Sequence, residues 1–265
     1  MTINLAIVSV LTSFFLLPLT DTIVAQVDEP IQYVPPKLAT DDRPEGRRRG
    51  GSSRGNCESS IPLIALSPEI QIPLSEDSQS FRSSYNSVLS QTTEARPSFW
   101  FYVPYKLNSV SLQFDLQAED NTVLYEVNLP NNRDDVGVVQ IPLPENIPAL
   151  QFDTRYRWFL SAECSPGERF VVYVEGWLDR VPLADDIGLQ LAQTSPHDQA
   201  AIYASHGMWQ DAITLLGEQY RTNPTNTDLA SDWHSLLESV ELEALAEQPL
   251  IDCCMPSTPA GSFEH

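Results

Sequence analysis

The stretch SFWFYVPY, residues 98–105, is apolar at nearly every position, on both faces of the strand that it would form. Aromatic and β-branched side chains favour strands, and a short apolar run without alternation is typical of a fully buried strand. The stretch therefore predicts a central strand of a β-sandwich.

Beyond this stretch the sequence alternates with a period of two. VSLQFDLQ (residues 110–117) alternates apolar and polar residues, and TVLYEVNL (residues 122–129) follows it after the turn residues AEDN. Such alternation is expected of half-buried strands, so the two segments predict a hairpin. Its apolar residues, all expected to face inward, are Val110, Leu112, Phe114, Leu116, Val123, Tyr125, Val127 and Leu129.

Four further segments bring the expected strands to about seven, the number typical of a sandwich. They are IPLIAL (61–66), VGVVQIPL (136–143), RYRWFLSAEC (155–164) and RFVVYVEGWLD (169–179). Leu150 precedes Tyr156 by six residues, a spacing that resembles the tyrosine corner of immunoglobulin-like and fibronectin type III sandwiches. We therefore expect residues 57–182 to form an antiparallel β-sandwich of this kind.

After Arg180 the apolar residues recur with a helical period. The segments are LADDIGLQLAQ (183–193), PHDQAAIYASHG (196–207), WQDAITLLGEQYRTNP (209–224) and TDLASDWHSLLESVEL (227–242). One set of their residues resembles a single tetratricopeptide repeat: Tyr203, Gly207, Trp209, Ala212 and Pro224. Residues 183–250 are thus expected to form a short helical module, which makes the chain an α+β protein. One repeat cannot bury its own apolar faces, so the module must pack on the chain's own sandwich or on another protein.

The N-terminus predicts export. An apolar run from Leu5 to Leu17 is followed by Pro18 and by IVA before Gln26, the pattern of a secretory signal cleaved after Ala25. An uncleaved membrane anchor is the rival interpretation, but a membrane span needs roughly 20 apolar residues. Residues 1–25 are therefore interpreted as a signal peptide, and the mature chain is expected in the periplasm or outside the cell.

Two segments have the composition of flexible chain. Residues 26–56 are rich in Pro, Gly and charge, which predicts a disordered leader, and residues 251–265 predict a flexible tail. The leader carries a cluster of arginines at Arg47, Arg48, Arg49 and Arg54. The cluster has two open interpretations, a solvated linker or a contact with an anionic polymer, a lipid headgroup or the chain's own acidic tail.

The net charge limits the choice of partner. The chain has 15 Lys and Arg against 36 Asp and Glu, a formal charge of −21, with most of the excess in the helical part. Phosphate groups repel such a chain, so we expect no nucleic-acid partner and no binding to anionic lipid surfaces.

Four cysteines are present: Cys57, Cys164, Cys253 and Cys254. Cysteines of exported proteins tend to pair, and the preferred pair joins Cys57, at the start of the fold, to Cys164, at the end of a strand. Three connectivities remain possible. The adjacent pair near the C-terminus has three open interpretations: an intermolecular bond, a metal site or an exposed tail.

Several motifs also occur in a characteristic order. After the export signal and the Arg/Gly leader come LIALSP (63–68), RPSFWFYVPY (96–105), RYRWFLSAEC (155–164), VEGWLDRV (174–181), YASHGMWQDAITLL (203–216) and DWHSLLESVEL (232–242). Together they resemble a mostly cyanobacterial family, domain of unknown function 928, over nearly the whole mature chain. The resemblance implies an exported protein of a photosynthetic bacterium and carries no activity, cofactor or catalytic residue.

The sequence is compatible with three alternative functions. The first is a non-enzymatic scaffold that binds a protein or peptide through helical residues Tyr203, Trp209, Tyr220 and Trp233. The second is a module that binds envelope or extracellular polysaccharide by stacking sugar rings on sandwich aromatics Trp100, Tyr102, Tyr105 and Trp177. The third is a hydrolase with the carboxylate pair Glu163 and Glu175. Because no catalytic, metal-binding or phosphate-binding motif is present, we expect no enzyme, no metal and no cofactor, and favour the first.

Overall fold

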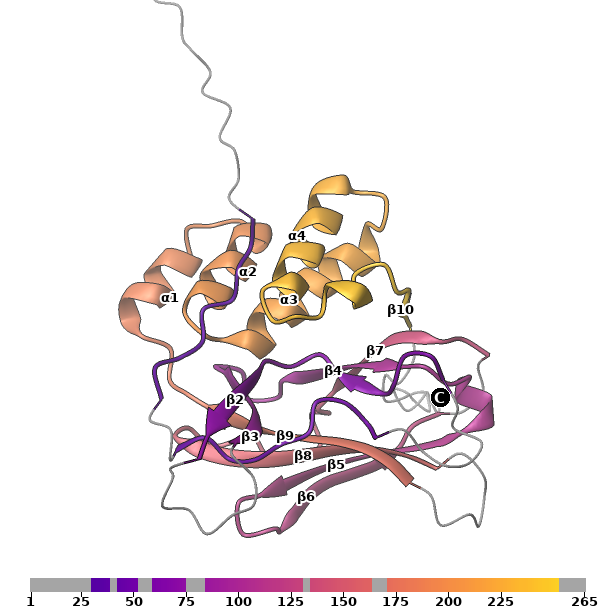
Figure 1. Cartoon of the computed structure of the whole chain (residues 1–265). Coiled ribbons are helices and arrows are strands. Elements are labelled where there is room, and N and C mark those ends of the chain that lie inside the picture. Colours follow the sequence, from indigo (N-terminus) through magenta and orange to yellow (C-terminus); the bar gives the residue numbers. More distant parts are fainter. Residues whose placement is uncertain are drawn as a thin grey trace, which may run out of the picture.

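The chain folds into two facing β-sheets, with helices covering the outer face of one of them (Figure 1). The computed structural model describes residues 30–38, 42–51, 59–74, 84–130, 134–163 and 171–252. Within these ranges it has two sheets and four α-helices, which confirms the predicted α+β class.

The described strands form one sheet of four and one of six. The smaller sheet has the order β1 (Ile64–Ala65), β4 (Ser98–Val103), β7 (Gly137–Pro142) and β10 (Leu250–Ile251). The larger sheet has the order β2 (Glu69–Pro73), β3 (Ser84–Thr92), β9 (Val171–Arg180), β8 (Thr154–Glu163), β5 (Ser111–Ala118) and β6 (Val123–Asn128). The expectation of purely antiparallel pairing is wrong at two places, because β3 pairs with β9 and β7 with β10 in parallel.

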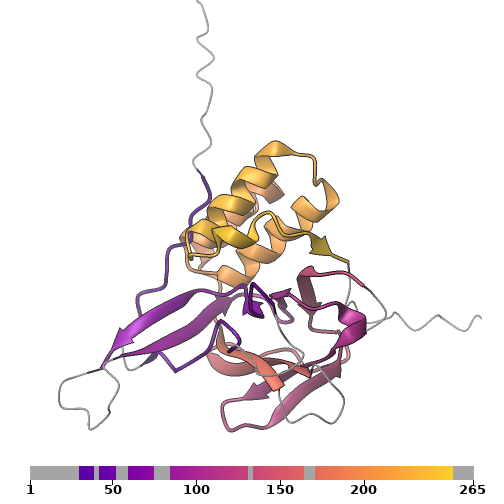
Figure 2. The same ribbon diagram turned by 45° about the vertical axis from the view of Figure 1, so that its right-hand side comes forward.

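The α-helices lie between β9 and β10 in the sequence and are together on one side of the sheets (Figures 1 and 2). They are α1 (Asp185–Leu191), α2 (Pro196–Ser205), α3 (Trp209–Thr222) and α4 (Thr227–Glu238), with short 3-10 turns η2 (Leu107–Ser109) and η3 (Glu243–Leu245). Ser195 caps α2, and the Asn226 side chain accepts hydrogen bonds from the first turn of α4. Among the described residues, no helix has the length and hydropathy needed to cross a membrane.

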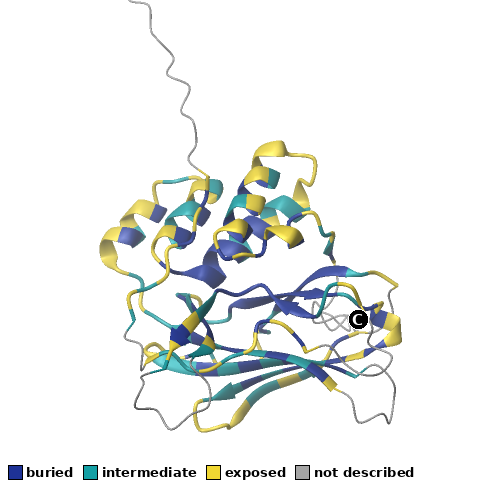
Figure 3. Cartoon of the chain, viewed as in Figure 1, coloured by how far each residue is buried: buried dark blue, intermediate teal, exposed yellow. Residues whose placement is uncertain are grey.

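Strand β4 separates two hydrophobic cores, as its two apolar faces require. Phe99 and Phe101 face the core between the sheets, where they contact Phe114. Trp100 and Tyr102 face the other way, into a core shared with the helices. Figure 3 shows β4 and β7 buried along their length. The helical segment therefore packs on the chain's own sheet, which is one of the two alternatives that the sequence left open.

Tryptophan side chains fix α3 on this sheet. Trp209 is fully buried and donates its indole N–H to the Leu66 carbonyl, at 2.8 Å. Trp100 donates to the Thr214 hydroxyl at 3.0 Å, and its ring lies so close to Gly217 that a Cβ there would sit 2.7 Å from it. Only glycine at position 217 allows the helix to approach the strand this closely.

The prediction of a disordered leader is wrong for residues 30–38 and 42–51. Ile31 and Tyr33 lie in the core between the helices and β4, and the Tyr33 ring meets Trp209 edge-on at 5.2 Å. Val34 donates its N–H to the Ala204 carbonyl at 3.0 Å. Two apolar side chains among polar residues give no periodic signal in the sequence, yet both are buried in this core.

The arginine cluster continues this ordered segment. Arg47 pairs with Glu175 of β9 through the backbone and Arg49 pairs with Ile64 of β1, so the segment bridges the two sheets. Arg48 is 3% exposed, donates to the Val240 carbonyl at 2.6 Å and lies 3.4 Å from Glu69. Burial and pairing exclude a solvated linker for Arg48.

Candidate functional site

The four residues of the predicted partner surface do not form a surface. Trp209 and Trp233 are 0% exposed, inside the core between the helices and β4. Tyr203 and Tyr220 are half-buried, and the Tyr220 ring lies 6.2 Å from the Trp233 ring. The two tryptophans form the core of the helical module, so a partner can reach only the two tyrosines.

Three of the four aromatics predicted to bind sugar are also buried. Trp100 and Tyr102 lie under the helices, and Tyr105 lies in the core between the sheets. Trp177 is half-buried, but its indole N–H donates to the Glu45 carbonyl and the Arg157 guanidinium lies 5.2 Å from its ring. These four aromatic residues therefore do not form a row of exposed rings on which a sugar could stack.

The two carboxylates considered for hydrolysis are far apart. Glu175 lies opposite Phe159 in the register of β8 and β9, four residues from Glu163, which places them about 13 Å apart along the strands. Paired carboxylates of glycosidases lie about 5 to 9.5 Å apart. Glu175 is also bound to Arg157, at 2.5 Å, so the pair does not have the geometry of that chemistry.

Several predicted features lie outside the described residues. These are the cleavage point after Ala25, Arg54, the four cysteines Cys57, Cys164, Cys253 and Cys254, and most of the tail. The disulfide between Cys57 and Cys164 therefore stays a prediction. In the described part of the chain, no group of three His, Cys, Asp or Glu side chains could hold a metal ion.

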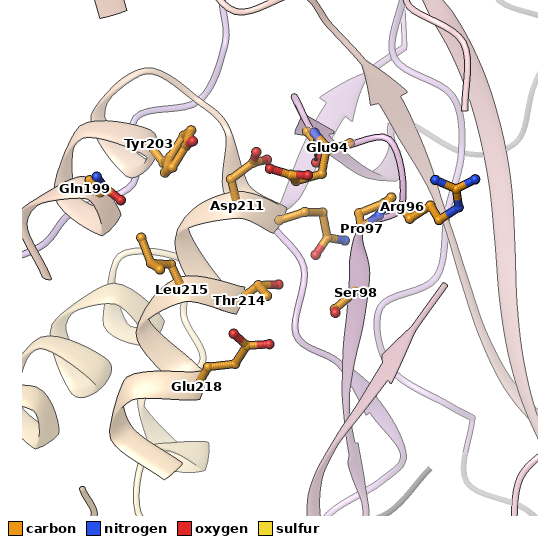
Figure 4. Close-up of a pocket in the computed structure, with 12 residues that line it drawn as sticks. Glu94, Arg96, Pro97, Ser98, Gln199, Tyr203, Asp211, Thr214, Leu215 and Glu218 are labelled. Carbon is orange, nitrogen blue, oxygen red and sulfur yellow. Dashed lines mark hydrogen bonds between the residues drawn. The ribbon is translucent and has the colours of Figure 1, made fainter. Parts of the chain in front are cut away.

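A cleft of about 380 Å³ lies between the helices and the loop that joins β3 to β4. Helix α3 contributes Asp211, Thr214, Leu215 and Glu218 to its wall. The spacing i, i+3, i+4, i+7 places these side chains on one face of the helix. Opposite them stands the loop with Glu94, and Tyr203 of α2 closes one end (Figure 4).

Asp211 is the buried acid of this cleft. Its side chain accepts hydrogen bonds from the Thr93 backbone N–H at 3.1 Å and from the Thr93 hydroxyl at 2.5 Å. Burial raises the pKa of Asp211 to about 6, although the bonds from Thr93 and Thr92 lower it, and the charge of Glu94 adds to the rise. Burial also raises the pKa of Tyr203, with a contribution from the Asp211 and Glu94 charges.

The cleft has more negative charge than its own chain neutralises. Glu94 and Glu218 are exposed, and no ion pair among the described residues involves Glu94, Asp211 or Glu218. Arg96 also lines the cleft, but its guanidinium donates to the Ile147 carbonyl at 3.0 Å and points away from the carboxylates (Figure 4).

One amide of the cleft has an unused acceptor. Gln210 is 2% exposed, and its amide nitrogen donates to the Ser90 hydroxyl at 3.3 Å. Its oxygen Oε1 is buried with no hydrogen-bond partner in the described part of the chain. Buried acceptors without partners are few in folded proteins, so this oxygen and the carboxylates together favour a ligand that donates hydrogen bonds.

Sequence reasoning favoured aromatic residues and found only Tyr203 of this cleft. The spacing of Asp211, Thr214, Leu215 and Glu218 is a signal that the sequence does contain, because it marks a second, polar face on α3. Glu94 gives no such signal, since only the tertiary fold brings it to the helix.

Comparison with known proteins gives one extensive match. A family model described as Domain of Unknown Function (DUF928) matches residues 49–250. No curated protein matches the chain significantly. Among solved structures, the PmoD soluble domain from Methylocystis sp. ATCC 49242 (Rockwell) is similar at 10% identity, over 47% of this chain and 99% of that one, with a TM-score of 0.27.

Proposed function

Because the chain belongs to the family described as Domain of Unknown Function (DUF928), whose description assigns no activity, we propose a function from its cleft. The protein is an exported, non-enzymatic interaction protein that binds a protein or peptide partner between α2, α3 and the β3–β4 loop. Export is supported by the N-terminal sequence, from the apolar run to Ala25.

The observation that carries this proposal is a buried acceptor without a described partner beside a buried acid in one cleft. Most buried polar groups of a folded protein are paired within the chain. Here the Gln210 oxygen has no described partner, and Asp211 is held in a site that disfavours its own charge. Perturbed acids in a cleft are typical of functional sites.

Capture with blocked variants tests the proposal. Leu215→Trp should fill the cleft, whereas Leu189→Trp makes the same change at a residue of α1 that is 65% exposed. Point variants are needed because the helices share a core with β4, so truncation after Arg180 would expose that core. Each protein is crosslinked in envelope extract and in culture medium of the source cells, and the captured protein is purified for affinity measurement.

We expect a purified partner to bind the wild type and Leu189→Trp equally, and Leu215→Trp at least tenfold more weakly, with all three proteins melting at similar temperatures. Equal binding to all three would place the partner elsewhere and contradict the proposal. A partner found only among cytoplasmic proteins would contradict export.

We also infer that the two sheets are an immunoglobulin-like sandwich and that α2 and α3 form one tetratricopeptide-like unit. Two features support this: the Tyr156 hydroxyl accepts from the Gln151 N–H at 2.7 Å, five residues upstream, and Gly207, at φ +83°, ends α2. The parallel pair of β3 and β9 departs from the antiparallel pattern.

The bond at Tyr156 can be tested by itself. Tyr156→Phe removes the acceptor of the Gln151 N–H from a partly buried hydrogen bond, so the free energy of unfolding should fall by about 0.5 to 1.5 kcal/mol. Urea unfolding measures this. An unchanged midpoint would remove the support that this bond gives to the immunoglobulin-like assignment.

A further inference from the structure

We propose that the cleft binds an extended basic segment of the partner, whose lysine or arginine side chains meet Glu94, Asp211 and Glu218. This inference rests on the proposed function and specifies the ligand of the same site.

The donor and acceptor chemistry of the wall points to a cation. Carboxylates accept hydrogen bonds and donate none, and the open position on Gln210 is its acceptor oxygen Oε1. An ammonium group offers three donors and no acceptor, and a guanidinium offers five. A neutral ligand such as a sugar carries acceptors as well as donors and would leave the negative charge of the cleft unpaired.

The mouth of the cleft lacks a positive charge where one would be most favourable. The carboxyl groups of Glu94 and Asp211 face each other in Figure 4, and no described basic side chain pairs with either. Burial is the main cause of the raised pKa of Asp211, and the nearby charge of Glu94 adds to it. A cation between the two carboxyl groups would reverse the repulsion between them.

The spacing of the acidic side chains favours an extended peptide segment as the ligand over a single metal ion. Asp211 and Glu218 are seven residues apart on α3, about 10.5 Å along the helix axis. Metal ions gather oxygen ligands within about 2.6 Å, and the described side chains form no such group. In a polyproline II segment, residues i and i+3 lie on one face about 9 Å apart, so two lysines at that spacing would reach both acids.

The net charge of the whole protein also attracts a basic partner. The chain carries a net charge of −21, and a field of that sign raises the association rate of a basic partner. This general attraction does not direct the partner to the cleft. A test must therefore separate general electrostatic attraction from binding in the cleft.

Binding of a synthetic peptide tests the inference. The probe is capped Lys-Pro-Pro-Lys-Pro-Pro, compared with the same peptide acetylated on both lysines, by calorimetry at pH 7.5. The variants are Glu94→Gln and Glu218→Gln, with Glu238→Gln as the control because Glu238 is exposed near the end of α4 and does not line the cleft.

We expect the lysine peptide to bind the wild type at least tenfold more tightly than the acetylated one. Each cleft variant should lose about three- to tenfold in affinity, the effect of one partly exposed charge pair, and Glu238→Gln less than twofold. Raising the salt from 50 to 500 mM should weaken binding, since it screens exposed charges.

Four results would overturn the inference. Equal losses in all three variants would mean general attraction to an acidic protein, and equal affinity for the acetylated peptide would mean that charge is not recognised. Spermidine binding as tightly as the peptide would indicate a small-amine site instead of a peptide site. A captured partner that loses affinity in Leu215→Trp but keeps it in Glu94→Gln and Glu218→Gln would retain the proposed function and reject the basic ligand.

Discussion

Replacing Trp209 with alanine should lower the free energy of unfolding by about 3 to 5 kcal/mol, the range for a fully buried tryptophan. The side chain is 0% exposed, touches Tyr33 and donates its indole N–H to the Leu66 carbonyl. Truncation would leave a cavity at the point where leader, helix and sheet meet, and an unpaired carbonyl. Urea unfolding at pH 7 measures the change.

Trp177→Ala is the matched control, because it removes the same side chain from a half-buried position on β9. We expect it to cost about 1 to 2 kcal/mol. The shared core would be disproved by equal losses for the two tryptophans. It would also be disproved if Trp209→Ala melted the helices in a separate transition and left that of the sheets unchanged.

Asp211→Asn should stabilise the protein by about 2 to 3 kcal/mol at pH 8. The pKa of Asp211 is raised from 3.8 to about 6, and each pKa unit corresponds to 1.36 kcal/mol. An asparagine oxygen can still accept both bonds from Thr93 but carries no charge to bury. Part of the gain is lost because its NH₂ group needs an acceptor.

The pH dependence of this effect has a definite sign. Between pH 4 and pH 6 the folded protein binds the Asp211 proton more tightly than the unfolded chain does, so the contribution of this group to stability falls as the pH rises through that window. The variant should therefore gain nothing at pH 4 and its full amount above pH 6. Urea unfolding at pH 4, 6 and 8 measures both proteins.

Asp186→Asn, at an exposed position in the first turn of α1, is the control and should change stability by less than about 1 kcal/mol at each pH. A constant difference between Asp211→Asn and the wild type across the three pH values would contradict the raised pKa. If the more stable Asp211→Asn protein also binds the basic peptide more weakly, the acid costs stability in exchange for binding.

The sequence predicted the strands whose burial follows a regular pattern. The expected alternation of residues 110–117 is found in β5, where Leu112, Phe114 and Leu116 are buried. Val123 was expected inward but is 52% exposed, because the register of β5 and β6 shifts after Leu116 and moves Val123 off the core face. A local bulge of this kind depends on the partner strand and does not change the periodicity of apolar residues in the sequence.

Strands that carry little apolar signal were missed. Strand β3 reads SYNSVLSQT, and Ser87, Ser90 and Thr92 are nonetheless buried. The segment is held between β2 and β9 by pairing with residues far along the chain. The cleft shows the same limit, since Asp211 and Glu218 share a helical face that can be read from spacing, whereas Glu94 and Gln210 gain their roles from the fold.

The bond between the Arg48 guanidinium and the Val240 carbonyl joins positions 192 residues apart, and β10 closes its sheet only after α4 and η3. Contacts so distant in sequence give the fold a high contact order, which slows folding. They also set the order of folding, because the core beneath the helices lacks both the bond to Arg48 and its last strand until Val240 and β10 have been synthesised. A nascent chain that has not yet reached Val240 therefore cannot complete this core.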